Sequence, residues 1–211
     1  MNFKNKKILV LAPHPDDAEF GCGATLARLI KEGATIKYLV FSPCNKSLPK
    51  NYKPEHLYSE LKAATAHLGI TEQSLMFYHF PVRDFPAYRQ DILEELVKVK
   101  KSYQPELVFL PNSKDVHQDH KTISEEGIRA FKNASLLGYE LSWNNYSFDN
   151  DFYFRIEMEH LDQKLKAIEE YQSQAFRHYK ENQTFESLAK LRGLQINYPL
   201  AECYELIRFI A

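Results

Sequence analysis

Short apolar segments that read as strands alternate with helical segments over the first two thirds of this chain. The predicted strands are rich in β-branched and aromatic residues and cover residues 7–12, 34–41, 75–80 and 107–110. The predicted helices show helical spacing of apolar residues and cover residues 18–31, 55–68, 88–103 and 122–131. Helices that connect successive strands predict a mainly parallel sheet with right-handed crossovers. The expected fold class is therefore α/β, a Rossmann-like three-layer αβα arrangement.

The C-terminal third is less regular. Its predicted elements are strands at 136–141 and 152–156, separated by a polar turn, and helices at 161–171 and 185–194. The apolar run at 202–210 fits either a strand or a helix. The sequence shows no repeat and no linker, and 211 residues suit one domain with a full core. We therefore expect a single domain over residues 1–211.

Composition excludes several classes of partner. The net charge of −1 gives no electrostatic reason to expect nucleic acid or an anionic membrane as partner. The apolar run at residues 8–12 is too short for a signal-peptide core or a membrane span. Cys22, Cys44 and Cys203 form an odd, unpatterned set that suits a reducing compartment better than a disulfide framework. These features predict a cytoplasmic protein.

Two polar clusters each follow a predicted strand. His14, Asp16 and Asp17 come directly after the first strand and open a helix, whereas His117 and His120 follow the strand at 107–110. Open α/β sheets bind their ligands at the carboxyl ends of the strands. Imidazole and carboxylate ligands suit a divalent ion such as zinc, and a second carboxylate is left to transfer protons. The two clusters together predict a metallohydrolase.

Ordinary structural roles compete with this interpretation. An isolated surface histidine or aspartate is usually solvated, and Asp17 or Asp119 also fits a helix N-cap. Asp115 fits a plain loop carboxylate as well as a site residue. Cys22 has no neighbouring base in its motif and is expected to pack in a helix rather than act as a nucleophile.

The two clusters resemble the motifs of the PIG-L/LmbE family of zinc-dependent N-deacetylases. The matching segments are His-Pro-Asp-Asp at 14–17, Glu-x-x-x-Ala at 60–64, Leu-Gly at 68–69 and His-x-x-His at 117–120. The usual first motif of the family is Ala-His-Pro-Asp-Asp, and here Pro13 stands between Ala12 and His14. Members act on N-acetylglucosaminyl phosphatidylinositol, on the mycothiol precursor and on amino-sugar antibiotic intermediates. The resemblance covers most of the chain.

The resemblance implies a role for each motif residue. His14, Asp17 and His120 would bind Zn²⁺, although Fe²⁺, Co²⁺ and Mn²⁺ suit the same ligands. Asp16 would be the general base that activates water. His117 would stabilise the oxyanion or protonate the leaving nitrogen, and Asp119 would hold His117 charged and oriented.

The expected reaction is removal of an N-acyl group from an amino sugar or a glycoconjugate, with acetyl as the favoured acyl group. The candidate substrate contacts, each of which also fits an ordinary surface role, are Arg83, Arg89, Arg155, Arg192 and Glu202. Tyr171 and residues 172–174 either line the cleft or end a helix. Deformylation, hydrolysis of a non-sugar amide and non-catalytic sugar or nucleotide binding remain alternatives. A homo-oligomer is compatible with the resemblance.

Overall fold

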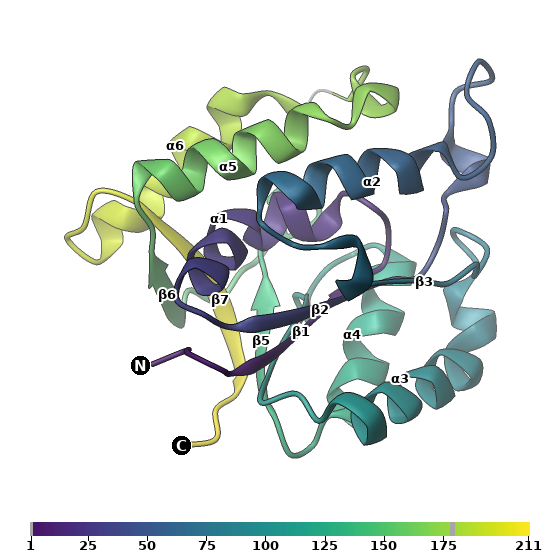
Figure 1. Ribbon diagram of the computed structural model, residues 1–211, viewed down its shortest axis with the longest axis horizontal. Helices are drawn as coiled ribbons and strands as arrows, with labels where there is room; N and C mark the ends of the chain where they lie inside the picture. The colour runs from purple at the N-terminus through teal and green to yellow at the C-terminus, as the bar shows by residue number, and fades with distance from the viewer. Residues whose placement is uncertain (1, 178–179) are drawn as a thin grey trace.

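A seven-stranded sheet forms the middle layer of the molecule (Figure 1). The structure, a computed structural model, describes residues 2–177 and 180–211. The strands are β1 (Lys7–Ala12), β2 (Thr35–Val40), β3 (Leu75–Phe77), β4 (Leu107–Pro111), β5 (Ser135–Tyr139), β6 (Phe152–Arg155) and β7 (Ala201–Arg208). They lie in the order β3-β2-β1-β4-β5-β7-β6. Strands β1 to β5 are parallel, and β7 runs antiparallel to both β5 and β6.

Helices cover both faces of this sheet. They are α1 (Asp17–Lys31), α2 (His56–His67), α3 (Arg89–Tyr103), α4 (Gln118–Ala130), α5 (Met158–Glu169) and α6 (Asn182–Gln195). Helices α1, α2 and α5 lie on one face with α6 beside them, and α3 and α4 lie on the other (Figure 1). The predicted three-layer α/β fold is therefore confirmed. Within the described ranges, no helix has the length and apolar character needed to cross a membrane.

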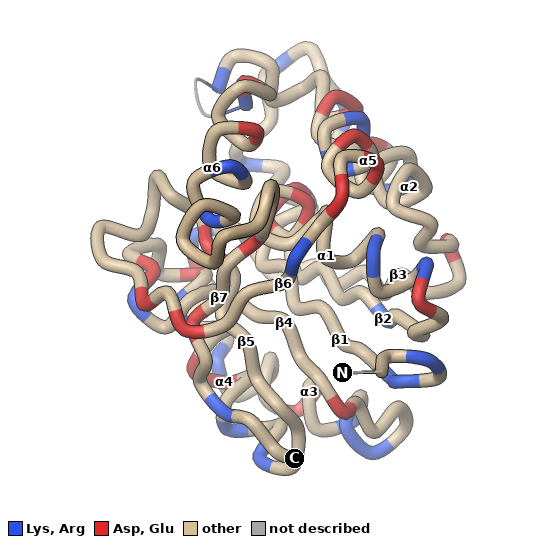
Figure 2. Tube along the Cα trace, turned by 90° about the vertical axis from the view of Figure 1, so that its left-hand side faces the viewer, with Lys and Arg blue, Asp and Glu red and all other residues tan. Residues whose placement is uncertain are grey.

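The central strands are buried on both faces, which explains their unbroken apolar sequences. In β1, Ile8 and Val10 pack in the cluster that includes α1, whereas Leu9 and Leu11 pack with Ile123 of α4. No charged residue occurs within β4 or β5, which are tan in Figure 2. Charged side chains near β4 and β5 therefore come from segments beyond the ends of these strands.

Two elements differ from the sequence expectation in ways that matter for the site. The segment 202–210, left open between strand and helix, is the antiparallel strand β7. The helix expected at 122–131 begins at Gln118, because the His117 side chain accepts the backbone N–H of Asp119 and caps the helix. His120 therefore sits in the first turn of α4 rather than in a loop.

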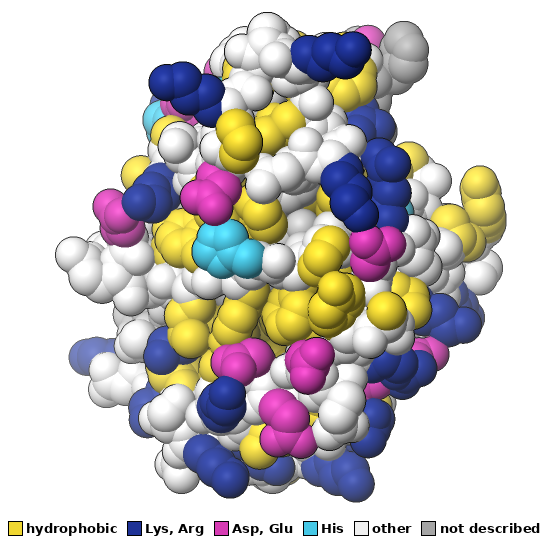
Figure 3. Space-filling model, turned by 90° about the vertical axis from the view of Figure 1, so that its right-hand side faces the viewer, with side chains coloured by type: hydrophobic (Ala, Val, Ile, Leu, Met, Phe, Trp, Pro, Cys, Tyr) yellow, Lys and Arg dark blue, Asp and Glu magenta, His cyan; other side chains and the backbone are white. Residues whose placement is uncertain are grey.

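The edge strand β3 is short, and only the first of its three side chains is buried. Beyond Phe77, the backbone N–H of Tyr78 donates to Val40 and that of Phe80 to Phe41, so irregular pairing continues. The side chains of all three aromatic residues are half-buried. On the face at the right of Figure 1, hydrophobic side chains gather in a band between charged ones (Figure 3).

Candidate active site

A cavity of about 380 Å³ lies where the carboxyl ends of the parallel strands meet. The segments that follow β1, β2, β3, β4 and β5 all contribute to its lining. Five of the predicted metal-binding and catalytic residues line it: His14, Asp16, Asp17, His117 and His120. The two motifs, about a hundred residues apart, meet because β1 and β4 are neighbours in the sheet. This is the expected location for a ligand in an open α/β sheet.

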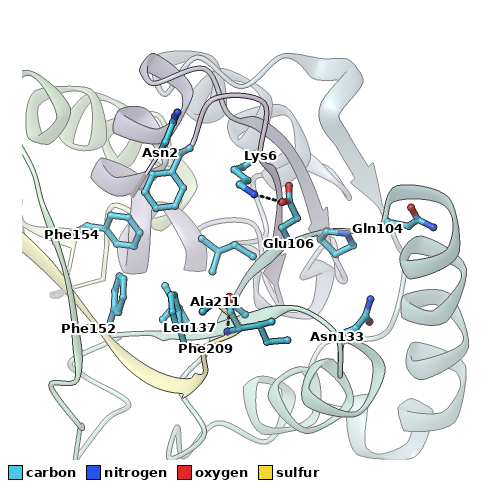
Figure 4. Close-up of a pocket in the computed structure, with 15 residues that line it drawn as sticks. Asn2, Lys6, Gln104, Glu106, Asn133, Leu137, Phe152, Phe154, Phe209 and Ala211 are labelled. Carbon is cyan, nitrogen blue, oxygen red and sulfur yellow. Dashed lines mark hydrogen bonds and ion pairs between the residues drawn. The ribbon is translucent and has the colours of Figure 1, made fainter.

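A larger cavity, about 530 Å³, lies at the opposite, amino end of the strands (Figure 4). Its lining is mostly apolar and includes Phe152 and Phe154. Its two ionisable side chains, Lys6 and Glu106, form an ion pair with each other. Its described lining contains no histidine side chain and no unpaired carboxylate side chain, so this cavity lacks the side chains typical of a metal or acid–base site.

Three potential ligand atoms converge in the smaller cavity. His14 Nδ1 and His120 Nε2 each lie 3.2 Å from the same oxygen, Asp17 Oδ2. The two nitrogens are 3.1 Å apart. Asp17 Oδ2 also accepts the backbone N–H of His14 at 2.9 Å, which fixes its carboxylate. The three atoms form a nearly equilateral triangle.

A buried carboxylate holds the far nitrogen of each histidine. His14 Nε2 donates to Asp119 Oδ2 at 3.0 Å, and His120 Nδ1 donates to Asp115 Oδ2 at 2.8 Å. These bonds set the tautomers, so that His14 Nδ1 and His120 Nε2 keep lone pairs that point toward the triangle. Carboxylates commonly orient metal-binding histidines in this way. From the sequence, Asp115 fitted a loop carboxylate as well as a site residue. The usual pairing of ligand histidines with carboxylates is the signal that favours the second role.

The predicted contact between Asp119 and the His117 ring is wrong. The Asp119 carboxylate instead binds His14 and accepts the backbone N–H groups of Arg83 and Phe85, at 2.6 and 3.3 Å. Only the backbone N–H of Asp119 contacts His117. Since α4 begins at Gln118, the Asp119 side chain points back toward the segment after β3 and toward His14.

The pKa of His117 favours a neutral ring, whereas the resemblance implied a charged one. Its Nδ1 accepts the N–H of Asp119 at 3.2 Å, so the proton of the neutral ring lies on Nε2. Burial, followed by the charges of His120 and His14, lowers the pKa of His117 to about 4. His14, His117 and His120 also lie close enough together to form a three-histidine metal group. Two ligand sets are therefore present, which differ in whether Asp17 or His117 is the third member.

The adjacent carboxyl groups of Asp16 and Asp17 have opposite pKa shifts. Burial and the negative charge of Asp17 raise the pKa of Asp16 to about 7. Burial also opposes ionisation of Asp17, but His120 and His14 outweigh it and lower that pKa well below its usual range. The pKa of His120 is about 10, because Asp17 and Asp115 outweigh the opposing effect of burial. The triangle thus favours a positive charge, while Asp16 can exchange a proton near neutral pH.

Arg83 is the one predicted substrate residue that the structure brings to the cavity. It is exposed, and its guanidinium donates to Ser47 Oγ at 3.2 Å. The other four predicted substrate contacts do not line the cavity: Arg89, Arg155, Arg192 and Glu202. Three of these form ion pairs with residues far along the sequence: Arg89 with Glu126, Arg192 with Glu140, and Glu202 with Lys164. Arg155 lies over the Tyr198 ring at 4.9 Å.

Further lining residues come from the irregular C-terminal third. Trp143 and Asn144 follow β5, and Gln174 and Arg177 lie at and after the 3₁₀ turn η4 (Gln172–Gln174). Gln174 therefore lines the cleft, whereas Tyr171 is fully buried in the core. Arg177 was missed, because no motif or periodicity marks its segment.

This arrangement matches a known family. The sequence family described as GlcNAc-PI de-N-acetylase, PIG-L, matches residues 9–131, more than half of the chain. The chain belongs to the PIG-L family. The resemblance seen in the motifs is therefore confirmed, and the match includes both histidine-containing clusters.

Individual relatives of this PIG-L member carry deacetylase names. It is 28% identical to the uncharacterized deacetylase YaiS of Escherichia coli, over 81% of this chain and 92% of YaiS. It is 26% identical to the diacetylchitobiose deacetylase of Thermococcus kodakarensis, over 65% of this chain and 53% of that protein. The N,N'-diacetylchitobiose deacetylase structure from Pyrococcus horikoshii superposes with a TM-score of 0.80 and 20% identity, covering 96% of this chain and 84% of that one. That last likeness concerns the fold alone.

Proposed function

We propose that this protein is a metal-dependent hydrolase that removes an N-acyl group from an amino sugar or its conjugate. The acyl group that we favour is acetyl. The observation that carries the proposal is the triangle of His14, Asp17 and His120 ligand atoms beside the free carboxyl group of Asp16. Membership of the PIG-L family and the deacetylase names of its relatives support amide hydrolysis. The substrate class follows from the diacetylchitobiose deacetylase relative.

The donor set fits a divalent ion. Bonds of 2.0–2.1 Å to a tetrahedral ion place neighbouring ligand atoms about 3.3 Å apart. The observed separations of 3.1 and 3.2 Å match this value. In the alternative set with His117, the available nitrogen is Nε2, which carries a proton and has no lone pair to offer. We therefore favour Asp17 as the third ligand, with Zn²⁺ first and Fe²⁺, Co²⁺ or Mn²⁺ as other ions that suit these donors.

The remaining residues have distinct tasks in amide hydrolysis. A divalent ion at the triangle would acidify a water molecule and polarise the amide carbonyl. Asp16 accepts the proton of the attacking water and returns it to the departing amine nitrogen. The Nε2–H of His117 donates to the carbonyl oxygen as that oxygen becomes negative. Neutral His117 suits this role, since its pKa of about 4 keeps it a stable donor near pH 7.

His117→Ala should lower kcat by about 10²–10³-fold, because it removes one hydrogen bond to the developing oxyanion. Zinc content should stay at the wild-type level, since His117 is outside the favoured ligand set. Acetate release and zinc analysis on the same preparation check both expectations. Loss of zinc from this variant would make His117 a ligand and contradict the assignment.

Asp119→Asn should weaken zinc affinity by about 10–100-fold, as expected when the partner of a ligand histidine is altered. The charged acceptor of His14 Nε2–H becomes a neutral one, which makes the His14 ring less basic. Competition with a chromogenic chelator measures the affinity. Asp162→Asn, an exposed substitution on α5, is the matched control and should leave the affinity unchanged.

The proposed reaction is tested by acetate and formate release from N-acetyl and N-formyl amino sugars. The panel contains free, nucleotide-linked and lipid-linked sugars, each with metal-stripped and zinc-restored protein. Zinc-dependent release from any member supports the proposal and ranks the substrates. Folded, zinc-loaded protein that releases neither acid would overturn it in favour of a binding role.

The same proposal places the protein in the cytoplasm with small molecules or glycoconjugates as partners. All three cysteines are free and buried, which supports a reducing compartment. The net charge of −1 supports a partner other than nucleic acid.

A further inference from the structure

Two arginines from distant parts of the chain line the same cavity as the histidines. Arg83 follows β3, and Arg177 follows η4. Among the described residues, neither guanidinium forms an ion pair with a carboxylate: Arg83 contacts Ser47 Oγ, and Arg177 contacts Gln174 Oε1. Arg89, by contrast, lies outside the cavity and is paired with Glu126. The two guanidinium groups at the cavity are thus held by neutral partners, and the charge of Arg177 acts on Asp16 without an ion pair between them.

The position of Arg83 is tied to the histidine cluster. Its backbone N–H donates to Asp119 Oδ2 at 2.6 Å, and the same oxygen accepts from His14 Nε2 at 3.0 Å. Its φ of +75° lies in the left-handed region, which is unfavourable for a non-glycine residue. The Gln118 side chain also donates to the Arg83 carbonyl at 3.3 Å. Arg83 is therefore held in a strained conformation at the cavity by the carboxylate that orients His14.

The position of Arg177 is fixed from the other side, by a buried carboxylate. Glu60 of α2 accepts the backbone N–H and the hydroxyl of Ser173, at 2.7 and 2.6 Å. Gln174 then donates to Ser173 Oγ at 3.2 Å and accepts from Arg177 Nε at 3.4 Å. Both terminal nitrogens of Arg177 are without a hydrogen-bond partner among the described residues. The side chain is half-buried, so these two donors are partly withdrawn from water.

The charges of the cavity favour an anion. Its carboxylates, Asp16 and Asp17, balance the two arginines, and a divalent ion at the triangle makes the sum positive. A guanidinium presents a planar fork of N–H donors that matches the oxygens of a phosphate or a carboxylate. A neutral sugar offers hydroxyl groups, which carry no charge to offset this positive sum.

We propose that Arg83 and Arg177 together bind an anionic group of the substrate, so that the enzyme selects N-acylated amino sugars that carry a phosphate or a carboxylate. This inference rests on the proposed function, because it concerns the substrate of the same site. The two arginines are specificity determinants in it, and they take no part in the hydrolysis itself.

The test measures binding by isothermal titration calorimetry to the full-length Asp16→Asn protein, which is expected to turn over its ligand at least about 10²-fold more slowly than the wild type. The ligands are N-acetylglucosamine 1-phosphate, N-acetylglucosaminyl malate and the neutral methyl N-acetylglucosaminide, each with zinc-loaded and zinc-free protein. The first two separate a phosphate from a carboxylate. We expect at least one charged ligand to bind about tenfold or more tightly than the neutral one, with and without zinc.

Arginine variants in the same background identify the residues responsible. Arg83→Gln and Arg177→Gln should each weaken the charged ligand by about tenfold and change the neutral ligand by less than about twofold. Arg89→Gln is the matched control and should change neither, because Arg89 lies outside the cavity.

Three results would overturn the inference. The first is equal affinity for charged and neutral ligands, including no detectable binding of any. The second is an anion preference that survives both arginine substitutions or depends on zinc, because the anion would then bind the metal. The third is equal weakening of charged and neutral ligands. Zinc-dependent acetate release without an anion preference removes this inference alone, whereas arginine-dependent anion binding without release removes the proposed reaction alone.

Discussion

His120→Ala is expected to abolish tight zinc binding and to lower kcat/KM by at least about 10³-fold. His120 Nε2 is one corner of the ligand triangle, 3.1 Å from His14 Nδ1 and 3.2 Å from Asp17 Oδ2. The remaining two ligands, His14 and Asp17, cannot hold an ion as firmly. Without the ion, the transition state loses several kcal/mol of charge stabilisation. Each 1.36 kcal/mol of lost stabilisation lowers the rate about tenfold. Metal analysis after gel filtration and initial rates of acetate release measure the two effects.

Unfolding is the competing explanation for such a loss, and two controls separate it. His120→Ala leaves Asp115 buried without its imidazole partner, so a lower melting temperature is expected as well. His120→Asn keeps a side chain of similar reach and should fold better while still binding zinc weakly. His79→Ala removes an exposed histidine outside the cavity and should leave metal and rate unchanged. Wild-type zinc affinity in either His120 variant would refute the ligand assignment.

The sequence predicted the site best where chemistry follows directly from a buried strand. Residues 8–12 of β1 and all of β4 are buried and apolar, so the first polar residues after each strand fall at the carboxyl edge of the sheet. His14 and His120 meet there because β1 pairs with β4. Strand pairing of this kind is a long-range property that the sequence did not predict, whereas the motif resemblance implied that the two clusters form one site.

Side-chain partners were harder to predict than backbone positions. Arg89 was a candidate substrate contact because it follows the third predicted strand, and Arg192 because the C-terminal third could close the substrate side; an ordinary surface role fitted both. Their actual partners are Glu126 on α4 and Glu140 directly after β5, and nothing in the local sequence links them to the arginines. Asp119 was paired with the wrong histidine for a related reason: its direction depends on where α4 begins, one turn earlier than apolar periodicity indicated.

The contribution of the C-terminal third to the cavity lining could not be predicted from the sequence for a different reason. Arg177 lies in an irregular segment whose position depends on Glu60, more than a hundred residues earlier in the chain. Apolar periodicity describes elements that pack on the sheet, whereas this segment is held by hydrogen bonds to a buried carboxylate. Specificity residues in such segments are therefore found from three-dimensional contacts, even where the catalytic motif is evident in the sequence.

Asp16→Asn is expected to keep its zinc and to lower kcat by about 10²–10⁴-fold, the usual contribution of a general acid–base group. The amide has nearly the shape of the carboxyl group but cannot accept a proton from the attacking water. Asp16 is outside the ligand triangle, so zinc affinity should change by less than about tenfold, much less than in a ligand variant. Asp162→Asn, exposed on α5, should leave both quantities unchanged. Zinc lost in parallel with activity would mean that Asp16 is a ligand rather than the base.

The pH dependence of the reaction separates Asp16 from other candidate bases. Burial and the charge of Asp17 raise the pKa of Asp16 to about 7, and a cation bound beside it moves this pKa downward. Only the ionised carboxylate accepts a proton, so kcat/KM of the zinc-loaded wild type should fall as pH drops through a single pKa at or below about 7. The residual activity of Asp16→Asn should lack this acidic limb, whereas His117→Ala should retain it. An acidic limb unchanged in Asp16→Asn would assign the base to a different group, because a side chain that no longer ionises cannot produce that limb.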